Sequence, residues 1–316
     1  MELMIGGVAF GLALFCAAIM GLAIQRGATC TVAAMQELVA ERRATRLVAL
    51  VEASMWVAFG LLVGRELGLL ADVPPSYALT RWTVFGAVLL GLGAVINRAC
   101  MFGSIARLGG GDWAYLATPL GFYLGCISFP WVFAPVAPQA LAAGSLVLAA
   151  PVWVVWLLAG LALARVTHSL LQRAGALRQP WSAHAATTVI GITFVAMFLL
   201  AGAWAYTDVL AELASGMARS VPGRILLALA LLGGAIAGGW LSRDARRAPV
   251  TPVSIARCAV GGMVMGWGSL MIPGGNDGLI LLGMPLLWPY AWVSFATMCL
   301  VVGVALSLPA ARRRAS

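Results

Sequence analysis

The sequence predicts an all-α, polytopic membrane protein that forms one membrane domain over residues 1–316. Hydrophobic residues make up 62% of the chain and charged residues only 10%. A soluble domain usually has about 45–50% apolar and about 25% charged residues. Mean hydropathy is +0.97, and apolar runs long enough to cross a bilayer recur along the whole chain. The apolar excess is too large for the core of a soluble protein.

Nine apolar runs predict membrane-spanning helices, at 3–24, 47–70, 82–106, 113–133, 141–162, 186–206, 223–242, 257–286 and 289–309. Three shorter stretches predict surface or re-entrant helices, at 28–40, 74–80 and 208–218. Glu2 rather than a basic region precedes the first run, and no small-x-small cleavage site follows it. We therefore expect a retained helix rather than a signal peptide.

The arginines predict the orientation of the chain, because cytoplasmic loops carry an excess of basic residues. With the N-terminus outside, the outer segments hold only Arg65, Arg81, Arg219 and Arg224. The inner segments then hold the basic runs at 41–46, 242–247 and 312–314, which places the C-terminus in the cytoplasm. The net charge of +9 thus indicates topology rather than nucleic-acid binding.

An internal repeat relates two of the predicted spans. The segment GAVLLGLGAVINRACMFG (86–103) aligns with GGMVMGWGSLMIPGGNDG (261–278). The same alignment, continued without a gap, pairs WAY (113–115) with WPY (288–290). The two copies lie five spans apart, so they insert with opposite orientation. Weak internal symmetry of this kind is typical of transporters. We expect repeat halves at approximately 1–162 and 186–316, joined by a cytoplasmic loop at 163–185.

Both copies of the repeat are interrupted midway. Asn97, Arg98 and Cys100 break the first apolar run, and a Pro-Gly-Gly-Asn sequence breaks the second. Non-helical backbone at membrane depth survives only where it is buried in protein or lines a cavity. The free N–H groups that start the next half-helix attract anions. An arginine in the bilayer is costly, so Arg98 should face a cavity or bind an anion, or alternatively pair with a carboxylate or helix end.

The six cysteines show no metal-like spacing, so neither a disulfide nor a metal site is expected. Most lie in apolar runs, where a free cysteine behaves as a small hydrophobic residue. We assign helix packing to four of them: Cys16, Cys126, Cys258 and Cys299.

Several other polar residues carry structural predictions. Thr29 is expected to cap a helix that runs to about residue 40. Glu52, an acid within the membrane, is a candidate functional residue, and we favour a structural pair with an arginine. Asp277 should stabilise the start of a half-helix, with proton coupling as the alternative. His168 and His184 lie in the arginine-rich inner loop and are expected to be solvated.

Three segments resemble the motif regions of the YeeE/YedE family of inner-membrane sulphur transporters, whose characterised members take up thiosulfate. They are QRGATCTVAA (25–34), NRACMFGSIARLGGGD (97–112) and GWGSLMIPGGNDG (266–278). The resemblance implies an hourglass-shaped monomer of about nine spans plus short helices in a bacterial inner (plasma) membrane. It implies no cofactor, and because the chain also lacks ATPase motifs we expect a transporter rather than an enzyme.

The resemblance also implies that thiosulfate passes along cysteine thiols through transient S–H···S hydrogen bonds. Cys30 and Cys100 are the carried-over thiols, whereas Gly275 stands where family members commonly have a cysteine. Asn97 belongs to the same pathway, and Arg98 and Asn276 would attract or orient the anion. Arg26 would do so at a pathway mouth, or it is a plain topology residue.

Two alternatives stay open at this point. The protein could hand sulphur to a small cytosolic carrier protein through a persulfide on Cys100. It could also be a channel for a neutral small solute, in which the arginines are structural. The sulphur species, given the missing third cysteine, is left open.

Overall fold

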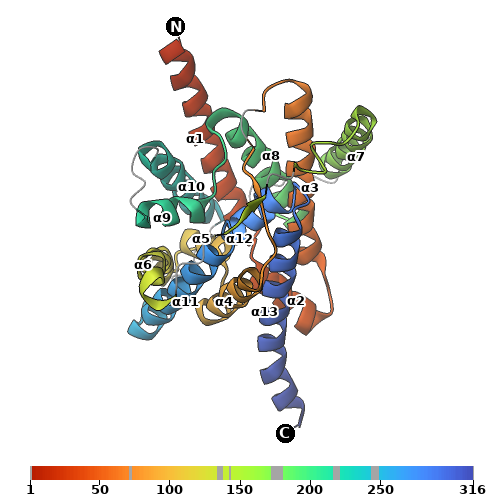
Figure 1. Ribbon diagram of the computed structural model, residues 1–316. Coiled ribbons are helices and arrows are strands. Elements are labelled where there is room, and N and C mark those ends of the chain that lie inside the picture. The colour runs from red at the N-terminus through yellow and green to blue at the C-terminus, as the bar shows by residue number, and fades with distance from the viewer. Residues whose placement is uncertain are drawn as a thin grey trace.

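The computed structural model describes residues 2–70, 73–133, 138–141, 144–171, 181–215, 221–242 and 249–315. Its helices in the first half are α1 (Glu2–Arg26), α2 (Thr31–Glu41), α3 (Thr45–Glu66), α4 (Arg81–Asn97), α5 (Met101–Gly109), the 3-10 helix η1 (Trp113–Leu116), α6 (Ala117–Val132) and α7 (Val152–Leu171). Those in the second half are α8 (Ala183–Ala201), α9 (Tyr206–Ala214), α10 (Val221–Ser242), α11 (Pro252–Met271), α12 (Asn276–Gly278), the π-helical turn η2 (Leu279–Gly283) and α13 (Pro289–Ala315). Helices α1 and α13 project from opposite ends of the molecule (Figure 1).

The predicted all-α membrane class is confirmed. Seven segments of the described chain are long and apolar enough to cross a membrane: Gly6–Glu41, Thr45–Glu66, Arg81–Gly109, Ala183–Ala201, Pro222–Ser242, Pro252–Met271 and Pro289–Leu308. Two of the nine predicted runs, 113–133 and 141–162, are not among these seven, and of α7 the described apolar part is Val152–Ala162. The run 113–133 divides into η1 and the 16-residue α6, and the run 141–162 becomes helical only at Val152.

The short elements and connections correct several sequence predictions. The stretches 28–40 and 208–218 correspond to α2 and α9. The stretch 74–80 is not a helix, since it contains strand β1 (Ser76–Tyr77), which pairs antiparallel with β2 (Ala140–Leu141). The predicted inner loop at 163–185 overlaps α7 and the start of α8, and its residues 172–180 lie outside the described part of the chain.

Both predicted breaks occur, and each turns on a residue with left-handed backbone geometry. At the first break, Arg98 has φ +61° and ends α4, and α5 begins at Met101. At the second break, Gly274 has φ +84°, and α12 begins at Asn276. The left-handed region is unfavourable for an arginine. A third break, at residues 27–30, separates α1 from α2 within the first apolar segment.

The two halves of the chain contain the same helices in the same order. At the offset of the sequence repeat, α1 to α6 correspond to α8 to α13, with α12 and η2 together matching α5. The packing partners exchange accordingly: α1 packs on α10 as α8 packs on α3, and α4 packs on α13 as α11 packs on α6. Among the described helices, none corresponds to α7.

Glycines at the crossing of α4 and α11 show the same exchange. A β-carbon built at Gly86 would lie 2.8 Å from the carbonyl oxygen of Gly268, and one at Gly93 would lie 2.7 Å from that of Gly261. Gly268 is the repeat partner of Gly93, and Gly261 is the repeat partner of Gly86. Reciprocal contacts of this kind are those of a two-fold axis. We therefore propose an inverted repeat of α1–α6 and α8–α13 around a pseudo-two-fold axis, with α7 outside it.

The crossing of α10 and α1 provides a test of this packing. A β-carbon at Gly234 would overlap the backbone carbonyl of Ala18, whereas one at the neighbouring Gly233 would meet nothing within 4 Å. Small residues allow such close backbone approach between membrane helices. We expect Gly234→Ala to destabilise the protein by about 3 kcal/mol, the upper part of the range for overpacking. Thermal unfolding of the purified protein measures the loss, and Gly233→Ala is the matched control. Equal stability of the two variants would contradict the packing.

Candidate functional site

The N-termini of α2 and α5 meet at two cysteines. Cys30 is the N-cap of α2 and Cys100 is the N-cap of α5. Their Sγ atoms are 3.6 Å apart, within the range of an S–H···S hydrogen bond. Cys100 is fully buried and Cys30 is 7% exposed. The two predicted thiols, far apart in the sequence, therefore form one thiol pair within the membrane domain.

Thr31 and Asn276 connect this thiol pair to the second break. The backbone N–H of Thr31 donates to Cys100 Sγ at 3.2 Å, and its hydroxyl donates to Asn276 Oδ1 at 3.2 Å. Asn276 is fully buried, and its Nδ2 has no hydrogen-bond partner among the described residues. An unpaired buried amide donor is costly unless a ligand accepts from it. The site therefore combines two thiols with a free N–H donor.

Asn97 shapes the first break from inside the protein. Its Nδ2 donates to the carbonyl of Ala99 and to Ser104 Oγ, both at 2.8 Å. Its Oδ1 accepts from Thr118 Oγ1 at 3.0 Å, and its carbonyl accepts from Tyr115 at 3.1 Å. The amide of Asn97 is thus engaged within the bend that presents Cys100.

The two predicted anion-attracting arginines lie in different environments. Arg98 is exposed, and the described part of the chain records no hydrogen bond or ion pair for its side chain. Arg26 ends α1 and is 6% exposed, and its carbonyl accepts from Trp181 N–H at 3.2 Å. The predicted capping role of Thr29 is wrong, because α2 begins one residue later with Cys30 as its N-cap. Thr29 Oγ1 is instead buried without a hydrogen-bond partner among the described residues.

The second break lacks thiols at both equivalent positions. Gly275 is the N-cap of α12 and the repeat partner of Cys100, and Ala205, the N-cap of α9, is the repeat partner of Cys30. Asp277 lies in the first turn of α12, as predicted. Its carboxylate also accepts from the backbone N–H of Thr207 at 3.0 Å and from the Thr207 hydroxyl. Asp277 therefore caps α9 and fixes it against the break.

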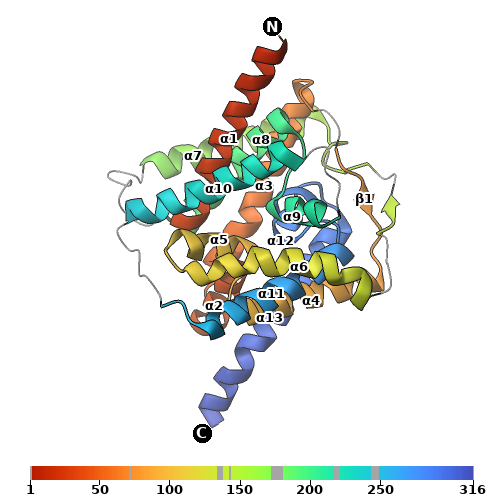
Figure 2. The ribbon, with the colours of Figure 1, turned by 90° about the vertical axis from the view of Figure 1, so that its left-hand side faces the viewer.

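A cavity of about 500 Å³, lined by both apolar and charged side chains and called the polar cavity below for the charged ones, ends at this second break. Gly274 and Gly275 form part of its wall, together with Thr207, Asp208 and Tyr290. An ion pair between Glu212 and Arg224, which also line the cavity, joins α9 to α10. The cavity therefore approaches Asn276 from the end of the molecule that carries α9 and β1 (Figure 2).

Sequence reasoning missed Thr31, Asp208 and Tyr290. Thr31 stands directly beside a predicted thiol, and Asp208 opens a stretch that the sequence marks as a possible re-entrant helix. Tyr290 is the repeat partner of Tyr115. The repeat alignment and the motif cysteines could therefore have indicated all three as neighbours of the site.

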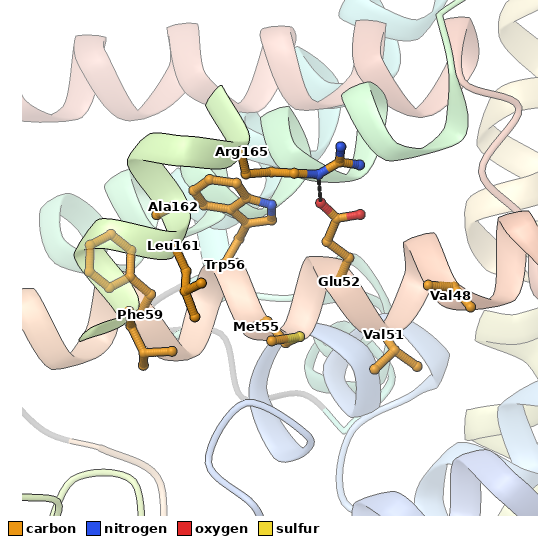
Figure 3. Close-up of a pocket in the computed structure, with 10 residues that line it drawn as sticks. Val48, Val51, Glu52, Met55, Trp56, Phe59, Leu161, Ala162 and Arg165 are labelled. Carbon is orange, nitrogen blue, oxygen red and sulfur yellow. Dashed lines mark hydrogen bonds and ion pairs between the residues drawn. The ribbon is translucent and has the colours of Figure 1, made fainter. Parts of the chain in front are cut away.

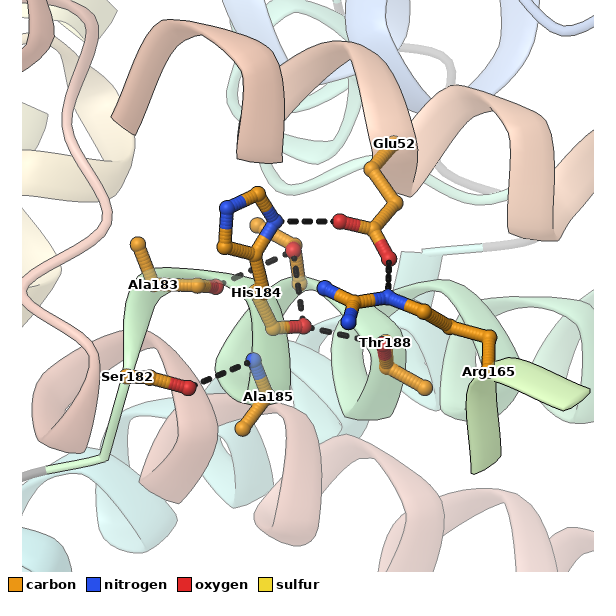
Figure 4. A network of polar contacts seen from close by, with 8 residues as sticks. Glu52, Arg165, Ser182, Ala183, His184, Ala185 and Thr188 are labelled. Carbon is orange, nitrogen blue, oxygen red and sulfur yellow. Dashed lines mark hydrogen bonds and ion pairs between the residues drawn. The ribbon is translucent and has the colours of Figure 1, made fainter. Parts of the chain in front are cut away.

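Glu52 forms a separate polar cluster that joins α3, α7 and α8 (Figure 4). Its carboxylate accepts from Arg165 Nε at 2.9 Å and contacts His184 Nδ1. The predicted pairing of Glu52 with an arginine is confirmed. The predicted solvated state of His184 is wrong, because the start of α8 holds it against Glu52. The side chain of His168 lies outside the described residues.

An apolar cavity of about 430 Å³ lies beside this cluster, between α3 and α7 (Figure 3). Apolar side chains such as Met55, Trp56 and Phe59 line most of it, and Glu52 and Arg165 also lie in its wall. None of its lining residues belongs to the thiol pair or to either break. This cavity therefore has the wrong polarity and position for the anion site.

Together, the apolar helices and the buried polar breaks are those of a multi-pass membrane protein. A family model described as sulphur transport matches residues 26–306, so the chain belongs to the sulphur transport (YeeE/YedE) family. The predicted family is confirmed, and the family function is transport of a sulphur compound across the bilayer. A comparison with curated proteins gave no match.

Proposed function

We propose that this protein imports thiosulfate, or a closely related small sulphur-containing anion, across a bacterial inner membrane. The N-terminus lies outside and the C-terminus lies in the cytoplasm. The anion passes from the polar cavity to Asn276 and then to the thiols of Cys100 and Cys30. The observation that carries this proposal is the thiol pair itself, with Sγ atoms 3.6 Å apart beside an unpaired amide donor.

The chemistry of the site suits an anion that carries both sulphur and oxygen. A thiol is a weak hydrogen-bond donor, which matches the terminal sulphur of thiosulfate. The Nδ2 of Asn276 supplies a stronger donor for a sulfonate oxygen. A series of weak sites favours conduction, because the solute must leave each one as easily as it enters.

The burial of Cys100 argues against the alternative of persulfide transfer to a small cytosolic carrier protein. Such a carrier would have to bring its own sulphur atom against Cys100 Sγ. Cys100 has no exposed surface, and Gly103 packs so closely that a β-carbon there would overlap Cys30 Sγ. Transient, non-covalent contact with a small anion therefore fits the thiol pair better.

Uptake of radiolabelled thiosulfate into cells that lack their own thiosulfate transport tests the proposal. We expect uptake only in cells that produce the protein, with competition by unlabelled thiosulfate and little by chloride or urea. Growth on thiosulfate as the sole sulphur source gives a second readout. Absence of uptake and growth in cells shown to contain the protein in their membrane would refute the thiosulfate assignment.

A further inference from the structure

Two arginines converge on one buried tyrosine at the end of the molecule opposite to the polar cavity. The guanidinium carbon of Arg107 lies 5.5 Å from the ring centroid of Tyr115, and that of Arg257 lies 6.0 Å from it. Arg107 comes from the last turn of α5, and Arg257 comes from the first half of α11. Tyr115 belongs to η1 and is 1% exposed. The thiol pathway uses none of these three side chains.

The arrangement leaves positive charge and hydrogen-bond donors available. Like charges that face one aromatic ring repel each other, and the ring compensates this only modestly. The Nε of Arg257 is buried without a hydrogen-bond partner among the described residues. The acid next to the cluster in the sequence, Asp112, is the N-cap of η1 and makes no capping hydrogen bond there. A small anion bound at these guanidinium groups would supply the acceptor that Arg257 Nε lacks.

A chain of hydrogen bonds connects this cluster to the thiol pair. Tyr115 donates its hydroxyl to the carbonyl of Asn97 at 3.1 Å. The side chain of Asn97 donates to Ser104, and Ser104 donates to the carbonyl of Cys100 at 3.0 Å. The same residues that form the first break thus also position the Tyr115 ring that both arginines contact.

The repeat places this cluster opposite the polar cavity. Tyr115 and Trp113 are the repeat partners of Tyr290 and Trp288, which both line that cavity. In Figure 2, α5 and the start of α11 lie on the left, and α9 and β1 lie on the right. The arginine–tyrosine cluster and the polar cavity therefore occupy equivalent positions in the proposed inverted repeat, one at each end of the pathway. One mouth carries Asp208 and the Glu212–Arg224 ion pair in its wall, and the other carries two arginines.

We propose that Arg107 and Arg257 form an oxyanion-binding site at the cytoplasmic mouth, which receives the substrate after the thiol pair. This inference rests on the proposed function and adds a residence site to it. Guanidinium groups present planar N–H donors that match the oxygens of a sulfonate or sulfate group. Because the two arginines come from different repeats, the site exists only when the two halves are assembled.

Transport from each side of the membrane tests the site. In proteoliposomes of uniform orientation, we expect Arg107→Gln and Arg257→Gln to raise the half-saturating thiosulfate concentration on the cytoplasmic side about tenfold, the effect of one lost charge-assisted hydrogen bond. The half-saturating concentration on the outer side should stay unchanged. Arg81→Gln is the matched control, since Arg81 makes the same kind of contact over Trp82 at 5.5 Å. If the half-saturating thiosulfate concentration on the cytoplasmic side is unchanged in both arginine variants, the inference is wrong.

Equilibrium binding separates this inference from the thiol pathway. The variant with Cys30→Ala and Cys100→Ala should still bind radiolabelled thiosulfate in detergent, and adding Arg107→Gln and Arg257→Gln should remove that binding. This result would support the arginine site even if the cysteine substitutions leave transport intact. Absence of binding in the double-alanine variant, or binding that survives loss of both arginines, would overturn the site.

Discussion

Replacing Cys100 by alanine should lower thiosulfate uptake at least about tenfold, the effect of losing one buried hydrogen-bonding partner. Cys100 Sγ contacts Cys30 Sγ at 3.6 Å and accepts from Thr31 N–H at 3.2 Å. Alanine removes the thiol that the anion must meet and leaves the N–H of Thr31 without its acceptor. It also isolates Cys30, so both members of the pair are affected. Initial uptake rates in cells with equal amounts of membrane-inserted protein measure the effect.

A cysteine away from the breaks provides the control for this prediction. Cys126 lies on α6, is 6% exposed and contacts the carbonyl of Gly266 at 4.0 Å. Cys126→Ala removes a buried thiol of the same size and should leave uptake near the wild-type rate. Cys100→Ser tests the chemistry, because it keeps a donor of similar geometry and should retain more uptake than alanine. Equal uptake by Cys100→Ala and Cys126→Ala would exclude Cys100 from the pathway.

The sequence predicts the breaks and the thiols because both depend on local patterns. Polar and glycine residues interrupt apolar runs at 97–100 and 273–276, and the structure bends there. The sequence repeat is visible in α4 and α11 because their glycines touch backbone to backbone, and no other residue fits at such a crossing.

The rest of the repeat cannot be recognised in the sequence, because its helix contacts tolerate different side chains. Cys30 corresponds to Ala205, and Thr31 corresponds to Tyr206, although both pairs begin matching helices. The two repeats keep the position and direction of these helices but not the identity of their residues.

Contacts between residues far apart in the sequence could not be predicted for a related reason. The contacts between Thr31 and Asn276, and between Glu52 and His184, join distant segments that only the folded chain brings together.

Gly275 stands where family members commonly have a third pathway cysteine. Introducing that cysteine by Gly275→Cys should destabilise the protein and lower thiosulfate uptake instead of improving it. A β-carbon at Gly275 would lie 2.7 Å from Thr207 Cβ and would overlap its hydroxyl oxygen. Thr207 cannot easily move, because its N–H and hydroxyl both donate to Asp277. Overpacking of this kind costs about 1–3 kcal/mol, so thermal unfolding of the purified variant should begin several degrees earlier.

The same cavity wall offers a matched position with room for a thiol. Gly278 also lines the polar cavity, and a β-carbon built there would meet nothing within 4 Å. We expect Gly278→Cys to unfold at the wild-type temperature and to react with a membrane-impermeant maleimide from outside. If Gly275→Cys is equally stable and transports faster than the wild type, Thr207 can yield, and Gly275 limits the thiol pathway. If it is less stable, as we expect, the glycine is required by the contact between α9 and the second break. The two-thiol pathway is then built into the packing of this chain.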